Sequence, residues 1–150
     1  MTDGSLNSIC EDLLSTLPLI ARITRKKISR LPAGFPEDIS PLHHEIMKTL
    51  EKEGTLHIAE IASRLLIPRP QMTHLIDRLA DLNLVERQMD SSDRRTINVT
   101  LTTKARTLLA EIDAMVKGNI KEALSSLTSE EMKELLASVT KLREILSKLG

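Results

Sequence analysis

The sequence predicts a mainly α-helical protein with one small β-hairpin, and three observations indicate this fold class. Apolar residues recur at spacings of three and four along most of the 150 residues, which is the pattern of helices that bury one face. Two short stretches after the middle of the chain instead alternate apolar and polar residues, as hairpin strands do. Aromatic residues make up only 1% of the chain, so the core must be aliphatic.

The first helix is expected over residues 5–31. Pro18 interrupts its apolar stripe and is expected to kink the helix or to split it into two segments. A loop should follow over residues 32–40, where proline and glycine cluster. The stripe consists of Leu6, Ile9, Cys10, Leu13, Leu14, Leu17, Ile20 and Ile23.

Two further helices are predicted between the loop and Pro68. Ser40 can cap the first of them with its hydroxyl, and Pro41 suits its first turn. Gly54 suits a left-handed position at the end of this helix. The second must end near Ile67, because Pro68 and the proline two residues later cannot lie inside a helix.

A fourth helix opens at Pro70 and should end at Asn83, which tolerates the left-handed conformation nearly as well as glycine. Residues 84–88 and 96–101 alternate as strands do, and the turn-forming residues 89–93 separate them. Two short helices followed by a hairpin form a winged helix-turn-helix. The inward face of the fourth helix is expected to be Met72, Leu75, Ile76, Leu79 and Leu82.

The chain should end in two long helices, the last of which opens with a capping box at Thr128. Their apolar stripes, like that of the first helix, are longer than a small core needs, so a partner subunit is expected to cover them. We therefore expect a single domain over residues 1–150. Within it, residues 40–102 would form the winged helix-turn-helix lobe, flanked by dimerisation helices at 5–31 and 103–150.

The charge distribution fits a DNA-binding lobe, although the net charge of the whole chain is zero. From Arg64 to Arg106 there are eight basic and five acidic residues, a net charge of +3, and local patches decide phosphate contacts. A helix with polar outer side chains and a hairpin with paired arginines at its tip suit a surface that follows double-stranded DNA. The candidate DNA-binding residues are Arg69, Gln71, Thr73, His74, Arg78, Arg94 and Arg95.

These candidates are expected to play different parts. Gln71, Thr73 and His74 lie in the N-terminal half of the fourth helix, the part that usually reaches base edges. Arg78 lies a full turn beyond His74 and could contact either a base or a phosphate, of which phosphate is favoured. Asp77 should face solvent or pair with a basic neighbour, because phosphates repel carboxylates.

Several segments together resemble the MarR family of transcriptional regulators, and the resemblance spans nearly the whole chain. The wing is similar to the family pattern of Asp-x-Arg leading into a strand that ends Leu-Thr. Asn83 and Ala105 stand where the family usually has glycine, and both are physically compatible with their positions. The similar segments are Asp93-Arg94-Arg95 with Ile97, Val99 and Leu101-Thr102, then Met72-Thr73, Leu75-Ile76, Arg78-Leu79 and Leu84-Val85-Glu86-Arg87.

The resemblance implies a homodimer with interleaved terminal helices and two winged lobes on a pseudo-palindromic operator. It favours Arg95 for a DNA groove, leaves Arg94 for a phosphate or an internal ion pair, and gives Asp93 the role of orienting an arginine. Many relatives are repressors that release DNA when a small lipophilic or aromatic ligand binds, or when a cysteine is oxidised. The residues that could pair with a ligand carboxylate are Arg22, Arg25, His43 and His44.

Three alternatives remain open at this point. The protein could be an architectural DNA binder without an effector, or a protein-interaction module that has kept the winged fold and lost DNA binding. It could also sense oxidants through Cys10, although a cysteine on an apolar stripe is more often a small buried residue.

Other classes of function are not supported by the sequence. It contains no Gly-x-Ser-x-Gly elbow, phosphate-binding glycine loop, zinc-protease signature or Cys-x-x-Cys, so neither an enzyme nor a cofactor is predicted. The pairs of histidine and glutamate are interpreted as structural or surface residues rather than metal ligands. We see neither a signal peptide nor an apolar run of membrane-spanning length, which predicts a cytoplasmic protein without a membrane partner.

Overall fold

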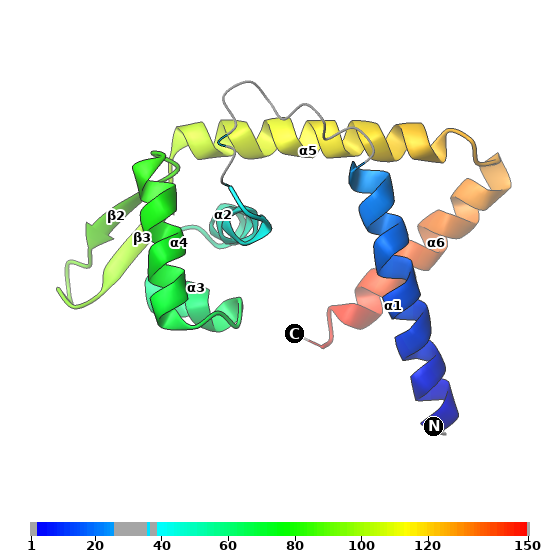
Figure 1. Ribbon diagram of the computed structural model, residues 1–150, viewed down its shortest axis with the longest axis horizontal. Helices are drawn as coiled ribbons and strands as arrows, with labels where there is room; N and C mark the ends of the chain where they lie inside the picture. The colour runs from blue at the N-terminus through cyan, green and yellow to red at the C-terminus, as the bar shows by residue number, and fades with distance from the viewer. Residues whose placement is uncertain (1–2, 26–35, 37–38, 150) are drawn as a thin grey trace. The chain divides into compact units, whose positions relative to one another are not determined.

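The computed structural model describes residues 3–25, 36 and 39–149, and in these ranges the chain forms six helices and a three-stranded sheet (Figure 1). The chain divides into two compact units. The winged lobe runs from Arg30 to Ala114, and the terminal unit combines Met1–Ser29 with Met115–Gly150. The elements are α1 (Asp3–Arg25), α2 (Pro41–Glu53), β1 (Leu56–His57), α3 (Ile58–Arg64), α4 (Arg69–Asp81), β2 (Val85–Met89), β3 (Ile97–Leu101), α5 (Thr103–Leu124) and α6 (Ser129–Leu146).

The sheet of the winged lobe is antiparallel, with the strand order β1-β3-β2. The hairpin register pairs Val85 with Leu101 and Met89 with Ile97, which confirms the predicted wing. The two-residue strand β1 was not predicted. It pairs Leu56 with Val99, so the hairpin is joined to the helices through its own inner strand.

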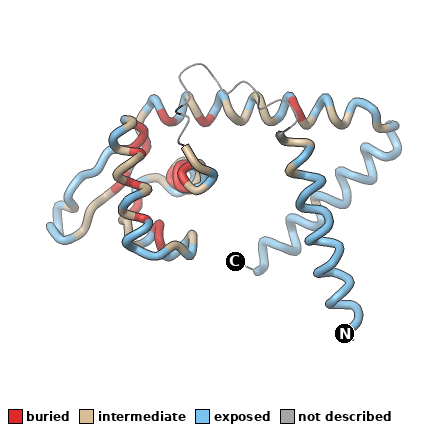
Figure 2. The backbone as a smooth tube through the Cα atoms, in the orientation of Figure 1, coloured by how far each residue is buried: buried red, intermediate tan, exposed pale blue. Residues whose placement is uncertain are grey.

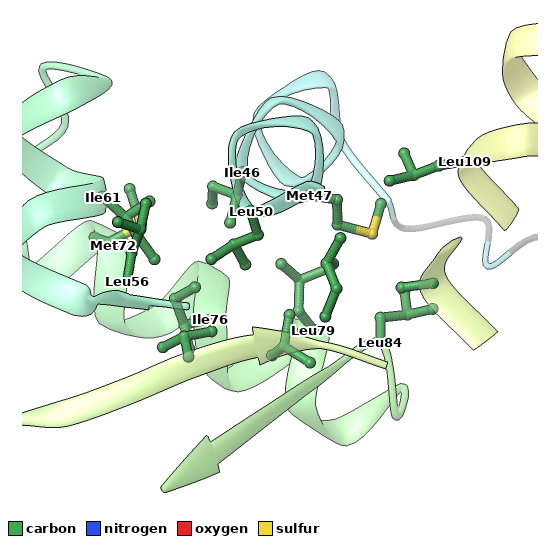
Figure 3. Close-up of a cluster of buried hydrophobic side chains, with 14 of the residues drawn as sticks. Ile46, Met47, Leu50, Leu56, Ile61, Met72, Ile76, Leu79, Leu84 and Leu109 are labelled. Atoms are coloured by element: carbon green, nitrogen blue, oxygen red, sulfur yellow. The ribbon is translucent and has the colours of Figure 1, made fainter. Parts of the chain in front are cut away.

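The core of the winged lobe is aliphatic, as the composition predicts. Figure 3 shows side chains of α2 and α4 pointing toward one another, among them Met47, Leu50, Ile76 and Leu79. These four side chains are fully buried, and so is Leu109 of α5. The predicted inward face of α4 is confirmed, because its residues are either fully buried or packed at the edge of this core.

Three of the helix ends in the lobe adopt positive φ angles. Gly54 has φ 82° and ψ −143°, so it needs the freedom of glycine but does not adopt the left-handed helical conformation predicted for it. Asn83 does adopt that conformation, with φ 57°, as predicted. α3 ends three residues before the predicted limit, because Leu66 turns the chain with φ 54° and the N–H of Ile67 donates to the Ala62 carbonyl at 3.0 Å.

The helix caps follow the sequence closely. The Ser40 hydroxyl lies 3.5 Å from the N–H of His43 at the start of α2, and the Thr128 hydroxyl accepts from the N–H of Glu131 at 3.2 Å. The Glu131 carboxylate accepts from the N–H of Thr128 at 2.7 Å, which completes the predicted capping box of α6 and lowers the pKa of Glu131. Thr102 accepts from the Ala105 N–H and so starts α5.

The terminal unit buries far fewer of its described residues than the winged lobe does (Figure 2). α1 continues through Pro18 as one helix, so the predicted split is wrong, and residues 26–31 of the predicted helix lie outside the described residues. Cys10 is exposed in the single chain, in contrast to the expected buried residue. α6 has no buried residue along its 18 residues. The side-chain amide of Asn119 on α5 donates to the Thr24 carbonyl of α1 at 3.1 Å.

An open apolar groove of about 720 Å³ lies on the terminal unit. It is formed by α1, the C-terminal part of α5 and α6, and we call it the apolar groove. Among the described residues, Lys133 is the one charged residue that lines it. The groove is lined by Ile20, Ile23, Thr24, Ile120, Leu124, Met132, Lys133, Leu135, Leu136 and Val139.

Candidate nucleic-acid interface

The polar face of α4 is presented to solvent by the burial of its other face. Met72, Ile76 and Leu79 fix the helix against the core, and Gln71 and His74 are left exposed. Thr73 is half-buried, and its hydroxyl donates to the Arg69 carbonyl at 3.1 Å. Pro68 and the proline at the second helical position leave few N–H groups without a partner at this N-terminus.

The loop between β2 and β3 is held by carboxylates rather than by apolar packing. Asp90 accepts from the Ser92 hydroxyl at 2.5 Å, the Ser92 N–H at 2.8 Å, the Asn98 amide at 3.1 Å and the Asp93 N–H at 3.1 Å. These hydrogen bonds, with those from Ser92 largest, hold the pKa of Asp90 well below its usual range.

Asp93 fixes the backbone of the wing arginines. Its Oδ1 accepts from the Arg95 N–H at 2.9 Å and its Oδ2 accepts from the Thr96 hydroxyl at 3.3 Å. The expectation that Asp93 orients an arginine thus takes the form of a main-chain contact. Arg94 and Arg95 are both exposed. No carboxylate pairs with Arg94 among the residues that the structure describes, so the predicted internal ion pair is not formed here.

A groove of about 290 Å³ is lined by α4, the hairpin and the junction of β1 with α3, and we call it the arginine groove. It brings together Arg69, Thr73 and Arg95 from the sequence-predicted residues. The other four predicted residues do not line it: Gln71, His74, Arg78 and Arg94. The lining residues are His57, Ile58, Ala59, Arg69, Thr73, Arg87, Arg95, Thr96 and Ile97.

Arg87 is the residue of this groove that sequence reasoning did not assign. It lies on β2, and its Nη1 donates to the Asp77 carboxylate on α4. The side chains of Arg87 and Asp77 are 31% and 45% exposed, so the pair lies at the surface. The expected pairing of Asp77 with a basic neighbour is confirmed, and the partner could have been suspected from the Leu-Val-Glu-Arg segment that contains Arg87.

The four residues predicted to bind an effector are not brought together at one site as the arginines of the groove are. His43 is buried and its Nδ1 accepts from the Ser40 N–H at 3.0 Å, so this ring is part of the cap of α2. His44 is half-buried, and burial lowers its pKa. Arg22 is exposed on α1, and the side chain of Arg25 lies outside the described residues. The two arginines belong to the terminal unit and the two histidines to the winged lobe.

Residues 3–25, 36 and 39–149 contain no group of three or more histidine, cysteine, aspartate or glutamate side chains that could hold a metal ion. No helix in the same ranges has both the length and the apolarity to cross a membrane.

A helix-turn-helix whose second helix is exposed along its polar face, followed by an arginine-bearing hairpin, defines a winged helix protein of the DNA-binding class. The MarR family model matches residues 39–97. Over 136 residues the chain is 29% identical to the HTH-type transcriptional repressor MdtR of Bacillus subtilis (strain 168), and the match covers 89% of this chain and 88% of that protein.

Solved structures agree with this match. The YusO protein from Bacillus subtilis has 26% sequence identity and a TM-score of 0.71, over 96% of this chain and 98% of its own. Streptococcus pneumoniae FabT, solved in complex with DNA, has 18% identity and a TM-score of 0.64, over 99% and 100%. Residues 39–97 thus match the MarR family, and the chain as a whole is similar in sequence to the transcriptional repressor MdtR.

Proposed function

We propose that the protein is a homodimeric repressor that binds a pseudo-palindromic operator, with α4 in the major groove and the wing on the adjacent minor groove or backbone. The observation that carries this proposal is the arginine groove, in which Arg69 of α4 and Arg95 of the wing line one surface. The named relatives support it, since MdtR is described as a repressor and FabT was solved with DNA.

The individual residues keep the roles expected from the sequence. Exposed Gln71 and His74, with the neighbouring Thr73, would contact base edges near the N-terminus of α4. Arg95 would supply phosphate or minor-groove attraction, and Arg94, which is exposed in the same turn before β3, would supply a phosphate contact. Arg78 is half-buried and would reach phosphate at the edge of the helix.

The dimer is supported by the apolar side chains that the terminal unit leaves in solvent. Leu136 is 69% exposed and Val139 is 53% exposed, and both line the apolar groove. An amphipathic helix with one apolar face obtains most of its stability by burying that face against another element. A second copy of this chain is the partner that we propose for it.

The dimer geometry gives the experiment that tests the proposal. Two recognition helices related by a two-fold axis enter successive major grooves about 34 Å apart, so half-sites should be centred about ten base pairs apart. Selection of bound duplexes from a random library should enrich an inverted repeat with this spacing. Binding without any enriched sequence would favour the architectural alternative, and no binding to duplex at low salt would contradict DNA recognition altogether.

Two substitutions then separate base readout from backbone attraction. Arg95→Ala should weaken binding to DNA of every sequence. It should also lower the slope of log K against log salt by about one for each wing. Gln71→Ala should change which operator is preferred and leave the salt dependence unchanged. A Gln71→Ala variant that lost affinity equally for all sequences would remove this residue from base readout.

We further propose that a small lipophilic or aromatic ligand releases the repressor from its operator. The support is the family alone, in which a MepR-like protein was solved with pseudoligands at 24% identity and a TM-score of 0.53. Titration of the operator complex with a panel of aromatic acids should displace the protein. If no compound shifts either operator affinity or the melting temperature, the effector proposal is wrong while DNA binding stands.

A further inference from the structure

The arginine groove has the composition of an anion site. Three guanidinium groups line it, and they come from three separate places in the chain: Arg69 from α4, Arg87 from β2 and Arg95 from the loop before β3. No carboxylate is among the nine described residues that line it. Guanidinium groups that are brought close together repel one another, and a bound anion removes this repulsion.

Among the described residues, a single carboxylate pairs with a guanidinium group of these arginines. Asp77 pairs with the guanidinium of Arg87, whereas those of Arg69 and Arg95 have no carboxylate partner among the residues that the structure describes; Asp93 contacts only the main-chain N–H of Arg95. Two of the three guanidinium groups are therefore left without a carboxylate contact among the described residues. The Arg87 contact uses one Nη1 donor, and a guanidinium has five N–H groups in a planar fork that suits the oxygens of a phosphate.

The position of the groove identifies the phosphate. On the proposed function, which this inference depends on, α4 enters a major groove and the wing reaches the adjacent minor groove. The two grooves of a duplex are separated by one sugar–phosphate strand, so that strand must pass between α4 and the hairpin. The groove has a volume of about 290 Å³, which is large enough for a phosphodiester group.

We propose that the arginine groove holds one phosphodiester of the DNA strand that passes between α4 and the wing. Arg87 is its central ligand, Arg69 and Arg95 flank it, and Asp77 is a positioning residue that fixes the Arg87 side chain. The site therefore couples the recognition helix to the wing through a single phosphate.

The test uses Arg87→Gln in the full-length protein, with the operator from the selection experiment and a duplex of mixed sequence. Both should bind about tenfold more weakly, because a charge-assisted contact is lost. The slope of log K against log salt should fall by about one per winged lobe, and the ratio of the two affinities should not change. The matched control is Arg106→Gln, which removes an exposed arginine outside the groove and should leave the slope unchanged.

Two further variants distinguish a phosphate ligand from a purely structural partner of Asp77. Arg87→Lys keeps the positive charge and should retain the salt slope, with part of the affinity lost because the planar fork is gone. Asp77→Asn frees the Arg87 side chain without removing its charge and should not lower the slope. If Arg87→Gln and Asp77→Asn weaken binding equally, with the same slope as the wild type, Arg87 is structural and the proposal is wrong.

A neutral linkage locates the phosphate. Replacing one phosphodiester of the operator by methylphosphonate should weaken the wild type at one position in each half-site. At that position Arg87→Gln should show no further loss. Additive losses at every position would overturn the assignment. If inorganic phosphate raises the melting temperature of the wild type but not of Arg87→Gln, while DNA affinity is equal, the groove holds a free anion instead. Absence of any duplex binding by the wild type would reject the proposed function rather than this site.

Discussion

The winged lobe and the terminal unit are built from similar amphipathic helices, yet they bury them very differently. All fifteen buried hydrophobic residues found among the described residues belong to the winged lobe. Of the large hydrophobic residues exposed in the same ranges, fifteen belong to the terminal unit and only two, Leu66 and Met89, to the lobe. The periodicity of the sequence shows that a face is apolar, but it does not show whether the same chain covers that face.

The two units are therefore expected to respond to different variables. The lobe has an aliphatic core of its own, so its stability should be a property of one chain. The terminal unit has exposed apolar faces at α1 and α6, so its stability should depend on protein concentration if a second copy covers them. Each of the following predictions tests one side of this contrast.

The largest effect is expected from a charge placed on the apolar face of α6. Leu142→Glu or Val139→Glu would bury an unpaired carboxylate in the proposed dimer, which costs several kcal/mol. Both should be monomeric by sedimentation at micromolar concentration and should lose operator binding. Ala137→Glu adds the same charge at an exposed position on the opposite face of the helix and should remain dimeric. A folded wild-type monomer at micromolar concentration would contradict the proposed dimer.

Shortening a buried side chain of the lobe should lower the stability of the single chain, whether or not it forms a dimer. Ile76→Ala removes a fully buried side chain and should cost about 2–5 kcal/mol of unfolding free energy, with protection of lobe amides from hydrogen exchange reduced. Leu136→Ala should instead raise the dimer dissociation constant and leave lobe amides as protected as in the wild type. The contrast between the units is wrong if Leu136→Ala reduces the protection of lobe amides while Ile76→Ala raises only the dimer dissociation constant.

A smaller effect is expected at the two left-handed helix ends of the lobe. Leu66 and Asn83 have nearly the same φ, 54° and 57°, but only asparagine tolerates that conformation at low cost. Leu66 is 91% exposed, so removing it sacrifices little burial. Leu66→Asn should stabilise the lobe by about 1 kcal/mol, and Asn83→Leu should destabilise it by about the same amount. Denaturant unfolding measures both, and changes of the same sign would contradict the explanation.

These cases show what the sequence could and could not predict. Local signals were sufficient for the capping box at Thr128, the cap at Ser40 and the left-handed Asn83. The end of α3 was misplaced because a leucine gives no warning of a positive φ. The strand β1 is only two residues long, so it has no alternation to detect, and it exists because Leu56 pairs with the distant Val99.

The candidate interface likewise has features that the sequence predicts and features that it does not. Exposure of Gln71 and His74 follows from the helical period of α4, which a sequence displays directly. The arginine groove cannot be predicted from the helical period. It involves the pairing of Asp77 with Arg87 across the turn between α4 and β2. The exposure of Cys10 was also missed, since an apolar stripe is equally compatible with burial in the same chain and in a partner.

The smallest effect is a pH dependence confined to the winged lobe. Burial lowers the pKa of His44, and the nearby Asp113 opposes this shift without reversing it, while Lys48 adds to it and Glu51 and Glu45 oppose it. The unfolded chain therefore binds a proton to His44 at a higher pH than the folded lobe does. Stability from this residue is complete above the ordinary histidine pKa of about 6.5, and it is lost as pH falls through the lowered value in the folded state.

His44→Gln removes the titrating ring and should flatten the decline in unfolding free energy between about pH 7 and pH 5. His74→Gln, which removes an exposed histidine of α4, is the control and should leave that decline as it is in the wild type. Hydrogen exchange should place the change in the lobe, because Asp113 and Lys48, whose side chains form an ion pair at 3.0 Å, both belong to it. If His44→Gln declines as steeply as the wild type, the partial burial of His44 does not couple its proton to folding.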